Sequence, residues 1–175
     1  AHERSQSIAS ADALARFVRA HRVEVGDALS VPPLVPHSLQ HGVTVIEFQT
    51  PTYERKIIAA NQPVQTQNGW DTEAALALMD LDVVPTPARL QSRTRSIDPI
   101  ATTSEFSLHR LSFGDGQPLS VAELTSDYVL GFVLAGQIRI RDVVFSAGSA
   151  FFDPRPGTIA PLSDATCLVA SPCPA

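Results

Sequence analysis

A series of short apolar runs fills the second half of the sequence and constrains the fold most. From Phe106 onward the chain reads FSLHRLSF, YVLGFVL, QIRIR, VVF, SAFF and TCLVA, with turns that contain Gly, Pro or Asp between the runs. Short runs rich in β-branched and aromatic residues predict strands. Closely spaced strands without intervening helices are typical of a sandwich, jelly roll or barrel. Within the series, LAGQIRI predicts a tight hairpin with its turn at Gly136.

The first half of the chain mixes helix and strand signals. Apolar residues recur at helical spacing over residues 7–20 and again over residues 71–81, so we expect two helices there. Residues 82–100 hold three prolines and show no periodic pattern, which indicates a connection. Strands are expected in three further segments, at residues 28–31, 43–48 and 53–58.

Composition excludes several classes of function. The chain is 44% hydrophobic with a formal net charge of −5 at pH 7, and its basic residues never cluster beyond Arg55-Lys56. Nucleic acid is therefore not an expected partner, since phosphate binding needs a concentrated basic face. No apolar run is long enough to cross a bilayer, so we expect no membrane segment. Cys167 lies in an apolar run and fits a buried side chain, and nothing demands an oxidising compartment, so we expect a cytoplasmic protein.

The start of the chain suggests that a segment lies upstream. The sequence begins at Ala1, and its only methionine is Met79. Because translation begins with methionine, we expect either processing or a longer protein.

One proline-rich turn carries the strongest functional signal. In GDALSVPPLVPH, five residues separate Gly26 from Pro32, and His37 follows directly after another proline. Prolines stiffen the turn, and a metal ligand benefits from being held in place before the ion arrives. The stretch resembles the second motif of the cupin family, with Leu34 where that motif has its second glycine. We expect the ring of His37 to face the interior of a jelly-roll barrel.

With the residues that follow, GVTVIEFQTPTYERKI, the stretch looks more narrowly like the type I mannose-6-phosphate isomerases. The resemblance implies that His37 is a zinc ligand and that Arg55 is the catalytic arginine. Arg55 and Lys56 alternate along a predicted strand, so only one of them faces a barrel interior. Glu47 and Gln49 share a face, and we expect Glu47, Gln49 and Lys56 to contact the substrate.

The resemblance also implies two cupin-type barrels. Residues 1–82 would form the C-terminal part of a first barrel with helical segments, residues 83–103 a linker, and residues 104–175 a second barrel. The second barrel repeats the glycine and proline of the motif at Gly148 and Pro154, but Ile159 stands where the histidine belongs. It is therefore expected to be complete yet degenerate, and to pack rather than react.

The resemblance and the residues leave three functions open. The first is a zinc-dependent aldose–ketose isomerase acting on a hexose phosphate. One histidine cannot hold zinc alone, so the remaining ligands would come from an upstream segment or a partner chain that completes the first barrel. The second is a non-catalytic sugar-binding or regulatory cupin with a vestigial site. The third, an iron-dependent cupin oxygenase, fits less well. Other histidines are weaker candidates: His41 diverges from His37 on a strand or turn, and His109 fits a packed position.

Overall fold

A computed structural model of the chain describes residues 19–50, 72–85, 88–89, 95–124 and 127–173. The chain divides into two compact units, residues 1–88 and residues 89–175. The strand expected at 53–58, with Arg55 and Lys56, lies outside the described residues, as does the helix expected at 7–20 except for its last two residues.

The first unit contains few regular elements among its described residues. Helix α2 (Thr72–Leu78) confirms the second predicted helix in a shorter form. Strand β1 (Asp27–Ala28) covers only the start of the strand expected at 28–31, and it forms a two-stranded sheet with β2 (Ala88–Arg89). The strand predicted at 43–48 is wrong, because no described strand lies alongside that segment to pair with its backbone. No helix in the described part of the chain is long and apolar enough to span a bilayer.

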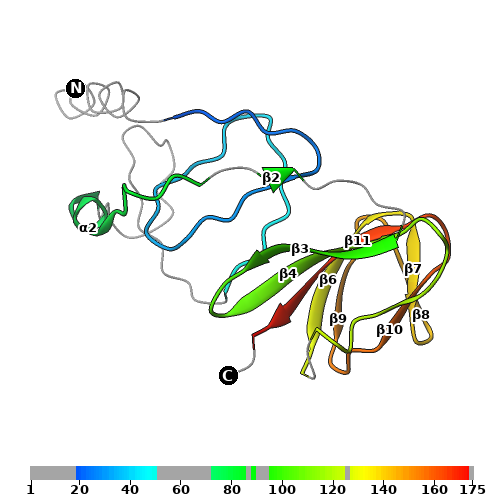
Figure 1. The fold of residues 1–175 in the computed structure, drawn as a ribbon. Coiled ribbons are helices and arrows are strands. Elements are labelled where there is room, and N and C mark those ends of the chain that lie inside the picture. Colours follow the sequence, from blue (N-terminus) through cyan, green and yellow to red (C-terminus); the bar gives the residue numbers. More distant parts are fainter. Residues whose placement is uncertain (1–18, 51–71, 86–87, 90–94, 125–126, 174–175) are drawn as a thin grey trace. The chain divides into compact units, whose positions relative to one another are not determined.

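The second unit is built from two antiparallel sheets, seen on the right of Figure 1. The five-stranded sheet has the order β3-β4-β11-β6-β9, and the four-stranded sheet has the order β5-β10-β7-β8. These sheets confirm the mainly β, jelly-roll class that the sequence predicts. The strands are β3 (Arg95–Thr102), β4 (Phe106–Phe113), β5 (Leu119–Ser120), β6 (Val129–Ala135), β7 (Gln137–Ile140), β8 (Val143–Ser146), β9 (Ala150–Asp153), β10 (Thr158–Pro161) and β11 (Thr166–Pro172).

Side chains from both sheets form one apolar core. Alternation along each strand turns every second residue inward, as with Leu111 and Phe113 on β4. Ile138 and Ile159 from the four-stranded sheet meet them from the opposite side. Ile159, which stands where the cupin motif would have its histidine, is almost fully buried in this core. Cys167 is likewise buried and free, and burial raises the pKa of its thiol to about 12.

Strand β3 corrects the expected linker at residues 83–103. Residues 95–102 pair with β4 instead of forming a connection. Pro99 is tolerated because β3 is an edge strand, and the pairing register shifts between Pro99 and Ala101. A proline without an N–H fits at such an edge or irregularity but would break a central strand.

The predicted hairpin turn at Gly136 is also wrong. Strand β6 pairs with β9 in one sheet, and β7 pairs with β8 in the other, so Gly136 is the corner where the chain passes between sheets. The two-residue turn of this long, bent hairpin lies at residues 141–142. Gly136 has φ of 70°, and a Cβ there would lie 2.1 Å from the carbonyl oxygen of Asp164. Only glycine fits such a corner.

An ion pair ties the hairpin turn to the next loop. Arg141 has φ of 51°, a left-handed conformation that non-glycine residues rarely adopt. Its Nη2 donates to Oδ1 of the almost fully buried Asp153 and to the carbonyl oxygen of Arg155 at 2.6 Å. The backbone N–H of Arg155 donates to the same carboxylate oxygen at 3.1 Å. These bonds hold the strained turn against the end of β9.

Replacing Gly136 by alanine tests the corner, and Gly116→Ala is its matched control. Gly116 has a similar φ of 71°, but a Cβ there would meet nothing within 4 Å. We expect Gly116→Ala to lower the free energy of unfolding by about 1 kcal/mol from backbone strain alone, and Gly136→Ala by about 2–4 kcal/mol from strain plus overlap. Urea denaturation measures both values, and equal losses would contradict crowding at the corner.

Candidate functional site

At one position in the turn from Gly26 to His37, the backbone has a conformation typical of glycine although the residue is not a glycine. Leu34 has φ of 67°, in the left-handed region that favours glycine. This is the position where the cupin motif has its second glycine. The backbone therefore takes the conformation that a glycine would allow, although the side chain is leucine. Such strain persists only where the surrounding structure enforces it.

Two hydrogen bonds and one buried side chain hold this turn in place. The side chain of Val35 is buried, and its backbone N–H donates to the carbonyl oxygen of Pro32 at 3.4 Å. The backbone N–H of Asp80, two residues beyond the end of α2, donates to the carbonyl oxygen of Leu34 at 3.0 Å. The turn is thus fixed to a segment more than forty residues along the chain.

His37 is oriented by its own backbone. Its Nδ1 lies 2.9 Å from the carbonyl oxygen of Val35. A carbonyl oxygen only accepts hydrogen bonds, so Nδ1 carries a hydrogen, and in the neutral ring the lone pair is then on Nε2. Histidines that bind metals are usually held in this way, with one ring N–H on a carbonyl or carboxylate and the other nitrogen on the ion. The residue thus fits the role of a single metal ligand.

Of the other predicted site residues, the structure describes only Glu47 and Gln49. His37, Glu47 and Gln49 are all exposed, so the described part of the first unit does not by itself enclose the ring of His37 in a barrel. Arg55 and Lys56 lie outside the described residues. Across the described ranges, no group of three or more His, Cys, Asp or Glu side chains is close enough to hold a metal ion. A zinc ion at His37 would need donors from elsewhere.

His109 is one of the titratable residues that the second unit places inward. It lies on β4 two residues before Leu111, so it shares the face that lines the core. Its Nδ1 is buried without a hydrogen-bond partner in the described structure, and burial lowers the pKa of the ring. The alternation in FSLHRLSF signals this inward position, because His109 keeps step with Leu111 and Phe113.

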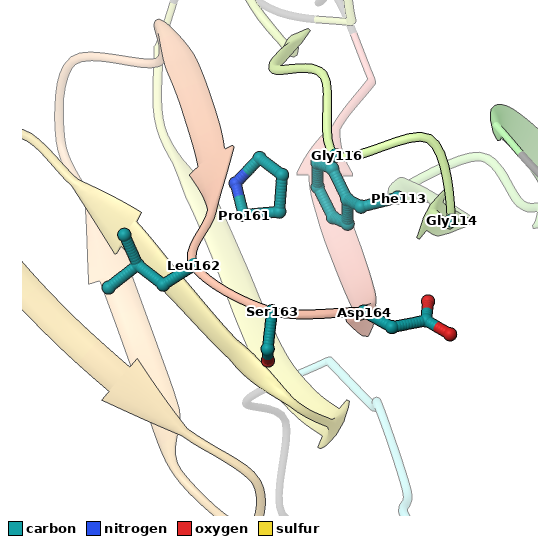
Figure 2. Close-up of a pocket in the computed structure, with 7 residues that line it drawn as sticks. All are labelled: Phe113, Gly114, Gly116, Pro161, Leu162, Ser163 and Asp164. Atoms are coloured by element: carbon teal, nitrogen blue, oxygen red, sulfur yellow. The ribbon is translucent and has the colours of Figure 1, made fainter.

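A surface pocket of about 410 Å³ lies between the loops that follow β4 and β10. Figure 2 shows the rings of Phe113 and Pro161 in it, while the carboxylate of Asp164 and the hydroxyl of Ser163 point away from them. The hydroxyl oxygen of Ser163 already accepts a hydrogen bond from the backbone of Gln137 at 2.9 Å. The pocket therefore lacks the converging polar groups that catalysis needs.

Comparison with known proteins finds likeness in fold. No protein family profile and no curated protein sequence matches the chain. Among solved structures, the chain resembles a cupin-2 domain protein of Shewanella frigidimarina at 16% identity, covering 45% of this chain and 80% of that one with a TM-score of 0.35. A cupin superfamily protein of Desulfitobacterium hafniense is 16% identical, with 49% and 84% covered and a TM-score of 0.37.

The mannose 6-phosphate isomerase of Bacillus subtilis is also similar to this chain. It is 13% identical, with 59% of this chain and 35% of that one covered and a TM-score of 0.41. These likenesses concern the fold alone, and the resemblance to cupins agrees with the one that the sequence predicts.

Leu34→Gly tests whether the turn is strained. Glycine removes the left-handed penalty of about 1–2 kcal/mol but gives the unfolded chain more freedom. Leu39→Gly is the control, because Leu39 is similarly exposed (61% against 57%) and has no positive φ. We expect Leu34→Gly to be more stable than Leu39→Gly by about 1–2 kcal/mol in urea denaturation. Equal stability would show that the turn carries no strain.

His109 should make stability depend on pH. Because burial lowers the pKa of this ring in the folded protein, the unfolded chain binds its proton more readily. The contribution of the neutral His109 ring to the free energy of unfolding is fully present above the unfolded pKa of about 6.5. It is lost as the pH falls through the lower pKa of the folded protein. We expect the urea midpoint to fall from pH 7.5 to pH 5 in the native protein, and to fall less in His109→Leu. An identical fall in both proteins would refute this role.

Proposed function

We propose that this chain belongs to a metal-dependent aldose–ketose isomerase that acts on a hexose phosphate. The observation that carries the proposal is the Gly26–His37 turn, with its glycine-type backbone at Leu34 and its oriented imidazole at His37. A turn that stores strain in order to present a ring nitrogen suits a ligand-binding role better than a plain surface loop.

In this proposal His37 holds a zinc ion through Nε2, while Val35 fixes the tautomer and direction of the ring through its carbonyl oxygen. The ion would polarise the oxygen atoms at C1 and C2 of the sugar as a proton moves between these carbons. The guanidinium of Arg55 would neutralise the negative charge that develops on the substrate. Lys56, Glu47 and Gln49 would contact the sugar phosphate.

The missing zinc ligands would come from a segment upstream of Ala1 or from a partner chain that completes the first barrel. A zinc ion needs about three or four protein donors, and His37 supplies one. We place the reaction in the cytoplasm, which the two free cysteines support.

A non-catalytic, sugar-binding or regulatory cupin is the second candidate. One specific observation favours it: the interior of the second unit is filled by apolar side chains, with Ile159 at the position expected for a ligand histidine. In that case the first unit would hold only a vestigial site, and the second would serve as a packed scaffold.

Metal analysis of the complete encoded protein tests the isomerase. We expect one zinc per chain, with occupancy falling about tenfold or more in His37→Ala because a ligand is lost. His41→Ala is the matched control, since His41 is also exposed and lies four residues along the same segment. Isomerase assays with mannose 6-phosphate should follow zinc content. Unchanged zinc in His37→Ala removes the metal role, whereas zinc binding without isomerisation favours the second candidate.

A further inference from the structure

Strands β6 and β9 carry apolar side chains on their outward face as well as on their inward face. Val129 and Val133 on β6 and Phe151 on β9 belong to the core. Alternation therefore turns the residues between and beside them outward, and none of these is polar: they are Leu130, Phe132, Leu134, Ala150 and Phe152. A sheet that faces water on one side usually carries polar residues on that side. This face departs from that pattern.

Four large side chains on or beside this face are open to solvent. Phe152 is 59% exposed, Leu130 is 44% exposed, and Tyr128 and Leu134 are each 40% exposed. Phe152 pairs directly with Leu130 across the two strands, and its ring centroid lies 5.6 Å from that of Tyr128. We call Tyr128, Leu130, Leu134 and Phe152 the aromatic patch. Contiguous apolar surface of this kind marks interaction sites on folded proteins.

The other sheet provides a contrast within the same unit. On β7 and β8 the outward positions pair Gln137 with Ser146 and Arg139 with Val144. That face mixes polar and charged groups with a single exposed valine, as a solvated face does. The aromatic patch is therefore a property of β6 and β9 and not of the whole surface of the unit.

We propose that the aromatic patch is the interface through which two copies of this chain associate, face to face about a twofold axis. The chain carries a net charge of −5 at pH 7, so two copies repel each other at long range. A patch without charged side chains is where such copies can approach closely. An uncharged face also matches a second copy of itself, because a twofold interface sets the same surface against itself.

The exposed area is enough for a weak dimer. From their exposed fractions, the four side chains offer about 350 Å² per copy, hence about 700 Å² in a pair. Interfaces are roughly 60% apolar, so the whole contact would bury about 1,200 Å². That value is at the low end for specific association and corresponds to a dimer that dissociates on dilution.

Sedimentation velocity of the full 175-residue chain at about 1 to 200 µM tests the proposal. We expect a monomer–dimer equilibrium that shifts toward the dimer when NaCl is raised from about 50 to 500 mM, because salt screens the repulsion between acidic copies. Phe152→Glu and Leu130→Glu should each weaken association by about tenfold or more, since each sets a charge against its own copy. Val144→Glu, at a 50% exposed outward position on the other sheet, is the control and should leave association unchanged.

Urea denaturation and circular dichroism of each variant establish that it remains folded, and Leu134→Ser offers a milder change at the same patch. A chain that stays monomeric at every concentration and salt level would overturn the proposal. Equal weakening by Val144→Glu and Phe152→Glu would overturn it as well, because the contact would then lie elsewhere.

Discussion

Close packing at two glycines stabilises the second unit. Both glycines lie in the long hairpin whose strands contribute to both sheets. At Gly136 the chain turns from one sheet into the other, and the Asp164 carbonyl approaches too closely for any side chain. On β6, a Cβ at Gly131 would lie 2.0 Å from the ring of Phe151, so that ring occupies the space above the glycine. The apolar core between the sheets depends on these two approaches. A larger residue at either point would push apart the layers whose contact excludes water.

The sequence predicts the strands of the second unit well, because strand formation there follows a local alternation of apolar residues. FSLHRLSF matches β4, and all of TCLVA falls in β11. The pairing of strands was harder to predict, since it depends on residues far apart in the chain. Gly136 looks like a hairpin turn locally, yet the strands on its two sides belong to different sheets. Pro99 suggests a linker, but it lies in the edge strand β3. The strand accommodates the proline at the point where its pairing register with β4 shifts.

The candidate site shows the same division between local and distant information. The motif spacing identifies His37. In the sequence Leu34 is a mismatch to the glycine of the motif, but its left-handed backbone has the conformation that a glycine would allow. No pattern in the sequence could reveal that the carbonyl of Val35 fixes the ring, or that the segment after α2 fastens the turn. The expected orientation of His37 toward a barrel interior requires neighbouring strands. The strand predicted at 43–48 does not form, and the ring is exposed.

The position of β11 has a consequence for how the protein is made. This strand, residues 166–172, lies in the middle of the five-stranded sheet, with β4 on one side and β6 on the other. During synthesis the ribosome delivers β4 and β6 long before β11, so both leave the exit tunnel with an unpaired edge toward the missing strand. The sheet closes only after residue 172 has emerged. Until then the edges of β4 and β6 that face the missing strand have no partner for their backbone groups.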